Sequence, residues 1–112
     1  MELITEKLGE VVVFKIKGRL DALAAPNFEQ KCLKRVEAGE SRFVVDLGEL
    51  EYISSAGIRT ILLVAKKLKT LEGELGFASI SGMVEKVFNI AGIYALFPMY
   101  ASLEDALAHP KR

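Results

Sequence analysis

The chain has 112 residues, of which 51% are hydrophobic and 27% are charged, as in an ordinary globular protein, and this length suits a single domain, 1–112, around one core. Fifteen basic residues balance fifteen acidic ones, so the net charge gives no reason to expect nucleic acid or an anionic membrane as partner. The single cysteine excludes an internal disulfide, no apolar run is long enough to cross a bilayer, and the first residues lack signal-peptide character. We therefore expect a cytoplasmic protein without direct membrane insertion.

The start of the chain predicts a β-hairpin. A short strand is expected at Leu3–Glu6 and a clearer one at Val11–Lys17, with a glycine-containing turn between them. In the second strand, Val12, Phe14 and Ile16 are expected to point one way and Val13, Lys15 and Lys17 the other, because successive side chains of a strand alternate between its two faces. The segment Gly18–Asp21 is then expected to break the strand.

A first helix is predicted at Pro26–Ala38. A proline is tolerated in the first turn because its missing N–H would be unpaired there in any case, and Gly39 is a natural stop. The expected inward face consists of Phe28, Cys32, Leu33 and Val36. No basic cluster surrounds Cys32 in the sequence, so we expect a small buried apolar residue and not a reactive thiol.

The centre of the chain predicts a buried strand, a short loop and a second helix. The β-branched run that begins at Phe43 predicts a strand to Leu47, closed by Asp46-Leu47-Gly48. After Gly57, apolar residues recur at helical spacing, and the residues between them should face water. The apolar set is Ile58, Ile61, Leu62, Ala65 and Leu68, and the water-facing set is Arg59, Thr60, Lys66, Lys67 and Lys69.

Ser54 and Ser55 are thus expected where the strand gives way to the helix. A helix start exposes backbone N–H groups and the positive end of the helix dipole. One reading of the two serines is that a hydroxyl simply caps the helix, because serine is a favoured cap residue. The other is that a hydroxyl is phosphorylated, because a phosphate is electrostatically well placed at a helix start.

The rest of the chain predicts two more strands and two more helices. A strand is expected at Leu75–Ala78 and a last short one at Phe97–Tyr100, where the proline favours a sheet edge. A third helix should open at Ser79 or Ser81 and end at Gly92. Its expected core residues are Met83, Val84, Val87, Phe88 and Ala91. A capping box predicts a terminal helix from Ser102 to about Ala108, followed by a frayed tail, residues 109–112.

The element order is therefore ββαβαβαβα. Its β–helix–β crossovers imply parallel neighbouring strands, and the initial hairpin adds an antiparallel one. The sequence thus predicts the α/β class, with a single mixed β-sheet packed against helices.

Catalytic chemistry finds little support in the sequence. The single histidine lies in the tail, which removes most metal sites and every Ser-His or Cys-His nucleophile pair. No glycine-rich phosphate loop is present, and adjacent carboxylates such as Glu104 and Asp105 are expected to be solvated. We expect no enzyme activity, no cofactor and no metal.

The central segment resembles the signature of STAS domains, the family of bacterial anti-sigma factor antagonists. The matching residues are Asp46-Leu47-x-x-Leu50-x-Tyr52-Ile53-Ser54-Ser55-Ala56-Gly57-Ile58, with Ser54 where the family usually has aspartate and Ile58 where it usually has leucine. Gly18-x-Leu20-Asp21 upstream and the third-helix pattern downstream also match. The resemblance implies the STAS (SpoIIAA-like) fold over essentially the whole chain.

The resemblance also implies a function. In the family, the unphosphorylated domain binds an anti-sigma factor that is also a serine kinase with a histidine-kinase-like ATPase fold, and so releases the sigma factor. The kinase inactivates the antagonist by phosphorylating it, and a serine phosphatase restores it. The acceptor corresponds to Ser55, with Ser54 as the alternative. The partner-binding surface near it would comprise Asp21, Ser54, Ser55, Ala56, Gly57 and Ile58. An alternative is a STAS subunit of a larger signalling or membrane-transport assembly that does not cycle through phosphate.

Overall fold

A computed structural model describes residues 1–108. Its strands are β1 (Glu2–Leu8), β2 (Val11–Leu20), β3 (Arg42–Ile53), β4 (Glu74–Ala78) and β5 (Met99–Tyr100). Its helices are α1 (Ala25–Glu37), α2 (Ser55–Thr70), α3 (Gly82–Ile90) and α4 (Leu103–Ala108). The expected order ββαβαβαβα is confirmed.

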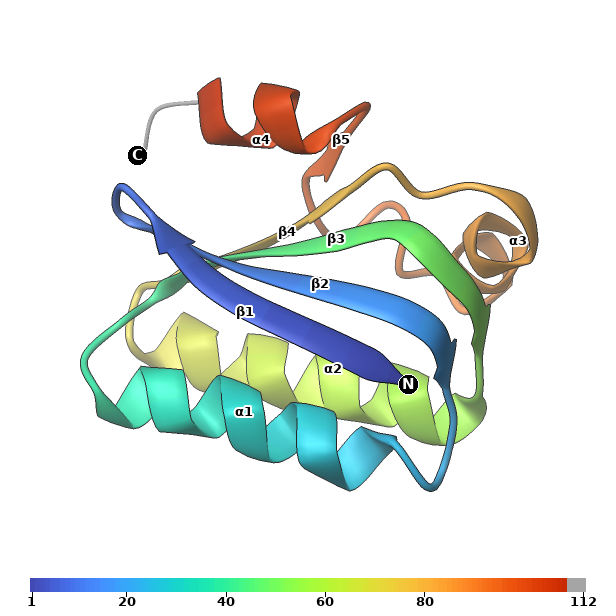
Figure 1. Ribbon diagram of the computed structural model, residues 1–112, viewed down its shortest axis with the longest axis horizontal. Helices are drawn as coiled ribbons and strands as arrows, with labels where there is room; N and C mark the ends of the chain where they lie inside the picture. The colour runs from blue at the N-terminus through green and yellow to red at the C-terminus, as the bar shows by residue number, and fades with distance from the viewer. Residues whose placement is uncertain (109–112) are drawn as a thin grey trace.

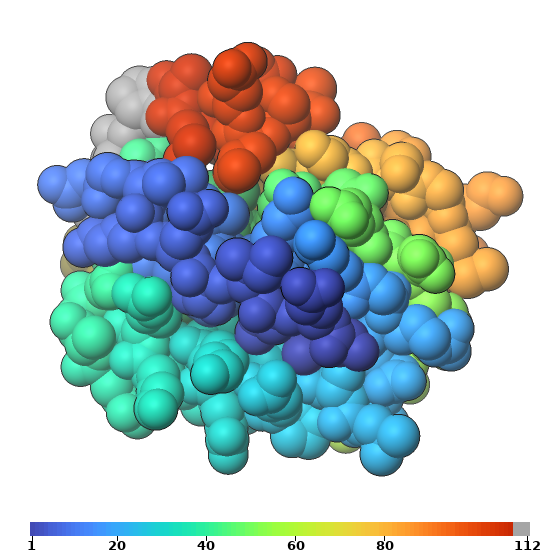
Figure 2. All heavy atoms as spheres, viewed as in Figure 1, coloured from blue at the N-terminus to red at the C-terminus, as the bar shows by residue number. Residues whose placement is uncertain are grey.

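The five strands form one mixed sheet in the order β1-β2-β3-β4-β5. β1 pairs antiparallel with β2, which confirms the hairpin, and each later strand pairs parallel with its neighbour. The crossover helices α1 and α2 lie side by side on one face of the sheet, whereas α4 lies over the other face (Figure 1). β1 forms one edge of the sheet, and its outer surface lies between α1 and α4 (Figure 2).

The larger hydrophobic core lies between the sheet and the pair α1–α2. Of the two alternating sets predicted for β2, Val12, Phe14 and Ile16 are fully buried in this core, whereas on the opposite face Val13 is buried and the two lysines are half-buried. Phe14 makes edge-to-face contacts with Phe28 of α1 and Phe43 of β3, with ring centroids 6.0 and 5.0 Å apart. Aromatic contacts of this kind add to the free energy gained by burying the rings. This packing fixes α1 against the centre of the sheet.

β3 is longer than predicted, and no loop separates it from the serines. It runs to Ile53, where the sequence predicted an end near Leu47. Its pairing with β2 shifts in register between Lys15 and Lys17 and again between Gly18 and Arg19, so β3 carries extra residues. Such β-bulges bend a strand without ending it. The segment Asp46-Leu47-Gly48 is therefore a bulge, although its composition is typical of a turn.

The same shifts explain a second correction. The second strand was expected to end before Gly18–Asp21, but β2 continues to Leu20. Gly18 has a φ of +90°, a conformation that L side chains rarely adopt, at the position of the second register shift. The two strands consequently reach the same end of the sheet together, with Leu20 paired to Ile53.

Several helix faces also differ from those predicted. In α2, Thr60 and Val64 are buried, whereas Leu62, expected in the core, is 41% exposed. In α3, Val84 and Phe88 are buried as expected, but Met83 is 57% exposed. Other residues expected in the core are also less buried than predicted: Leu33, Ile58, Ala65 and Val87 are half-buried, and Ala91 is exposed.

The C-terminal helix α4 begins with the predicted cap. The Ser102 hydroxyl accepts a hydrogen bond from the Asp105 N–H at 3.0 Å. Ala106 is buried and belongs to a smaller apolar cluster on that face of the sheet, with Val11, Val13, Val44 and Ala78. The predicted fraying of residues 109–112 concerns a segment outside the described residues. Within residues 1–108, no helix has the length and apolar character needed to cross a membrane.

Candidate functional site

Ser54 joins the end of β3 to the start of α2. Its backbone is extended, and its N–H donates to the Leu20 carbonyl at 3.0 Å. Its side-chain oxygen accepts from the Gly57 N–H at 3.3 Å, and its carbonyl accepts from the Ile58 N–H at 3.0 Å. Ser54 is therefore the N-cap of α2, with its hydroxyl oxygen engaged by the helix backbone.

Ser55 is the first residue of α2, and its side chain is exposed. Its hydroxyl makes no hydrogen bond with any side chain or backbone group of residues 1–108. The adjacent Ala56 and Ile58 are half-buried. Ser55 thus presents a free hydroxyl at the positive end of the helix dipole. An added negative charge would be tolerated there by the helix itself.

Gly57 is buried against the ends of β2 and β3. A Cβ atom at this position would lie 2.7 Å from the Leu20 carbonyl oxygen and 2.8 Å from Ile53 Cγ1. Both distances are shorter than real contacts of a Cβ atom, and the carbonyl belongs to the backbone. The start of α2 can approach the sheet this closely only because residue 57 is glycine. Gly57 therefore positions Ser54 and the exposed Ser55, with the half-buried Ala56 and Ile58 on either side of it.

Asp21 shapes the loop next to this junction. Its Oδ1 accepts hydrogen bonds from the Leu23 and Ala24 N–H groups, each at 3.1 Å. Its Oδ2 lies 3.9 Å from Arg19 Nε. The Asp21 carboxylate is thus an acceptor in the turn that leads into α1. This turn holds the Leu23 side chain 92% exposed.

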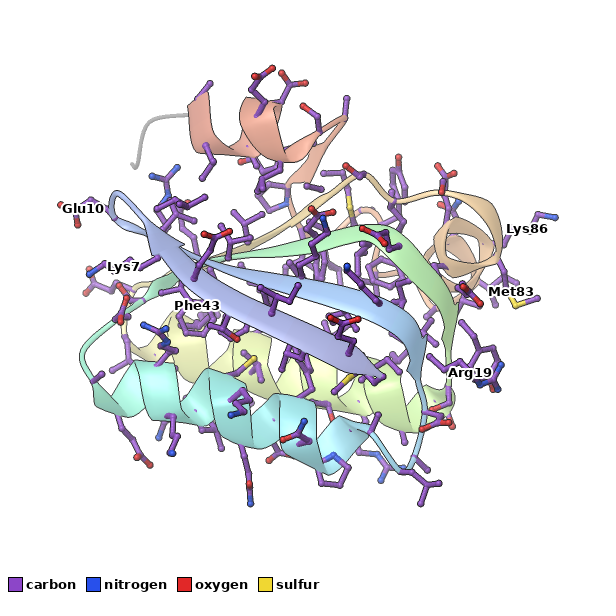
Figure 3. The ribbon with its side chains drawn as sticks, in the orientation of Figure 1. Lys7, Glu10, Arg19, Phe43, Met83 and Lys86 are labelled. Carbon is purple, nitrogen blue, oxygen red and sulfur yellow. The ribbon has the colours of Figure 1, made fainter. Side chains whose placement is uncertain are left out.

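Two residues near the junction were not singled out from the sequence. The Arg19 guanidinium carbon lies 4.1 Å from the ring centroid of Tyr52, a cation–π contact between the ends of β2 and β3. The bulge in β3 brings Arg19 and Tyr52 together, because it shifts the pairing of the strands after Gly18. Arg19 points outward at the end of the molecule where the exposed Met83 of α3 also lies (Figure 3). Only the alignment of the two strands, which the sequence does not reveal, could have identified this pair.

The open part of the sheet face that carries α4 is a charged surface. Glu49 lies 3.2 Å from Lys15 Nζ and 3.9 Å from Lys17 Nζ. The hydrogen bond with Glu49, together with its charge, raises the pKa of Lys15. These groups are solvent-exposed, so the pairs contribute little to stability. The single carboxylate of Glu49 thus offsets part of the positive charge of the two lysines.

The described residues offer no clear centre for catalysis. Burial raises the pKa of the Cys32 thiol far above its ordinary value, so the nucleophilic thiolate is disfavoured. Among residues 1–108, no three His, Cys, Asp or Glu side chains are grouped so that they could hold a metal ion. The single histidine, at position 109, lies outside the described residues.

Comparison with known proteins gives a consistent result. The STAS domain model matches residues 2–106. A Bordetella bronchiseptica protein named "Putative anti-sigma factor antagonist BtrV" is 39% identical over 96% of this chain and 93% of its own length.

Two solved structures have the same fold. A Thermotoga maritima protein, TM1081, superposes with a TM-score of 0.89 at 18% identity, covering 94% of this chain and 91% of that one. The Bacillus protein SpoIIAA in its phosphorylated form superposes with a TM-score of 0.79 at 23% identity, covering 95% and 96%. The predicted SpoIIAA-like fold is confirmed, and the chain belongs to the STAS domain family.

Proposed function

We propose that this protein is an anti-sigma factor antagonist whose binding is controlled by phosphorylation of Ser55. In its unmodified form it binds a serine-kinase anti-sigma factor of the histidine-kinase-like ATPase fold and so releases the sigma factor. The kinase phosphorylates Ser55 and ends the interaction, and a separate serine phosphatase restores it. The domain itself is a binding module of the cytoplasm, where ATP and the transcription machinery are available.

The observation that carries this proposal is the contrast between the two serines. Ser55 is exposed at the first position of α2, and its hydroxyl is free. The Ser54 oxygen is held by the Gly57 N–H, and its side chain is only half-exposed. A kinase can reach Ser55 without opening the helix cap, whereas modification of Ser54 would disrupt that cap. Ser55 is therefore the preferred acceptor, and Ser54 is the alternative.

Phosphate would act as a charge switch. It adds about −1.5 to −2 charges at neutral pH, in a position where the helix start stabilises an anion. An interface that fits a neutral hydroxyl would leave this charge repelled or unpaired. A penalty of ~3–4 kcal/mol would weaken the complex several hundred-fold. The surface that feels this charge also includes Asp21, Ala56 and Ile58.

Mass spectrometry after incubation with ATP and the candidate kinase from the same cell tests the proposal. The wild-type protein is compared with Ser55→Ala and Ser54→Ala. We expect one phosphate on Ser55, absent in Ser55→Ala and retained in Ser54→Ala. Phosphate on Ser54 alone would identify Ser54, and not Ser55, as the acceptor. Binding without any phosphate would leave a constitutive antagonist.

The second function in view is a STAS subunit that does not cycle through phosphate, within a larger signalling or membrane-transport assembly. It predicts neither phosphate transfer nor binding to a kinase of this type. The incubation above separates the two functions, because absence of both binding and phosphate supports the subunit.

A further inference from the structure

A groove of about 950 Å³ lies between α2 and the segment that leads into β5. Its α2 side includes Leu62, Lys66 and Lys69, and its opposite side is formed by residues 96–100. The lining also includes the buried Leu68 and Leu75, which belong to the main core. The groove is therefore apolar at its base and open along one side of α2.

The rim of this groove combines exposed apolar groups with free positive charge. Leu62 is 41% and Leu96 is 66% exposed. Lys66 and Lys69 form no ion pair with any carboxylate of residues 1–108. The acidic residue in the lining, Glu74, lies 3.7 Å from Arg42 Nε and is neutralised by it. The groove thus presents two uncompensated cations beside apolar surface.

The groove continues the surface that carries Ser55. An α-helix turns by about 100° per residue, so Leu62, Lys66 and Lys69 all lie within about 40° of Ser55 around the axis of α2. All four side chains are exposed. The 14 steps from Ser55 to Lys69 span about 21 Å along the helix. One exposed face of α2 therefore joins the phosphorylation site to the groove.

We propose that the partner that binds at Ser55 also occupies this groove, with apolar side chains flanked by carboxylates. This inference rests on the proposed function and extends its binding surface along the whole of α2. The apolar groups of the partner cover Leu62 and Leu96, and its carboxylates pair with Lys66 and Lys69. An amphipathic helix with an acidic border has this chemistry, because its apolar residues recur on one face.

Charge favours this occupant over a second copy of the chain. A two-fold dimer formed through the same surface on both copies would bring Lys66 and Lys69 of each copy together. Like charges facing each other in a contact oppose association. An acidic partner removes this repulsion. The groove is thus suited to a different protein.

The arrangement divides the interface into two parts. Ser55 lies at one end of α2 and is sensitive to phosphate, whereas Lys69 lies at the far end and is about 21 Å along the helix from it. Groups this far apart, with no shared contacts, act nearly independently. Changes in the groove should therefore weaken binding by the same factor whether residue 55 is neutral or charged.

Titration calorimetry with the purified kinase-type anti-sigma factor tests the inference on the full chain. The variants are Leu62→Asp with Leu96→Asp, and Lys66→Glu with Lys69→Glu. A matched control, Lys31→Glu with Lys34→Glu, makes the same charge change at exposed positions of α1. Circular dichroism and thermal unfolding verify that each variant is folded.

We expect each groove variant to raise Kd by about tenfold or more and the α1 control to change it less than about twofold. The variant Lys66→Glu with Lys69→Glu should also show a weaker dependence of Kd on salt concentration, because two charge contacts with the partner are lost. Equal Kd values for wild type and groove variants would overturn the inference. So would a groove variant that changes only self-association in sedimentation analysis, since this would identify a second copy as the occupant.

A parallel titration of Ser55→Glu separates this inference from the proposed function. If Ser55→Glu binds weakly and the groove variants bind like the wild type, the proposal that the partner occupies the groove is contradicted, and the proposed function is not. Unaffected binding of Ser55→Glu with weakened groove variants would support the groove and contradict control through Ser55. Absence of binding by the wild-type protein would contradict both.

Discussion

Gly57→Ala should destabilise the protein by closing the space between α2 and the sheet. The new methyl group would lie 2.7 Å from the Leu20 carbonyl oxygen and 2.8 Å from Ile53 Cγ1. The carbonyl cannot move freely, because it accepts the Ser54 N–H at 3.0 Å. Overpacking of this kind costs about 1–3 kcal/mol, and a weakened hydrogen bond adds about 1 kcal/mol. The better helix propensity of alanine returns about 1 kcal/mol, so the net loss should be about 2 kcal/mol.

Urea denaturation followed by circular dichroism measures this loss. With the slope usual for a small domain, the midpoint should fall by roughly 1 M. The control is Ala56→Gly in the same turn of α2, which changes helix propensity without overpacking and should cost at most about 1 kcal/mol. A Gly57→Ala protein as stable as the wild type would refute the reasoning. It would mean that α2 can start further from the sheet without cost.

Three further predictions concern the same junction and the core. Ser54→Ala should cost about 1 kcal/mol in urea denaturation through loss of the cap, whereas Ser55→Ala should cost less than ~0.5 kcal/mol; equal losses would contradict the assigned cap. Asp21→Ala should destabilise by about 1–2 kcal/mol and Asp21→Asn by less, because the amide oxygen can still accept the two N–H groups; equal losses would contradict the turn role. The Cys32 thiol should resist a disulfide reagent at pH 8 until the protein unfolds. Above about pH 8.5 the thiol ionises in the unfolded chain, whereas in the folded protein burial raises the pKa of Cys32 and keeps the thiol protonated. The free energy of unfolding should therefore fall by ~1.4 kcal/mol per pH unit above about pH 8.5, and this slope should be absent in Cys32→Ala.

The sequence predicted the central elements well because their signals are local. The alternation in β2 placed Val12, Phe14 and Ile16 on the same side of the strand, and all three are fully buried. The two serines were placed at a strand-to-helix junction because apolar periodicity changes there. These patterns depend only on the geometry of a strand or a helix, so no knowledge of the neighbouring elements was needed.

The failures have a common physical cause in long-range pairing. Asp46-Leu47-Gly48 has the composition of a turn, and only its alignment with β2 turns it into a bulge. Leu62 fits the apolar period of α2, yet it lies beside a groove and is exposed. Thr60 was expected to face water because it is polar, but its side chain is only 4% exposed. Whether a residue meets another element depends on the position of that element, which local periodicity does not contain.

The bulged strand also explains how a phosphate on Ser55 could change binding without changing the fold. β3 carries extra residues relative to β2, and its end is nevertheless fixed, because Ile53 pairs with Leu20 and Ser54 donates to the Leu20 carbonyl. Gly57 lets α2 start directly against this fixed end. The exposed side chain of Ser55 is attached to this rigid junction and supports no packing of its own. A charge added there alters the surface offered to a partner, while the cap, the sheet and the core keep their contacts.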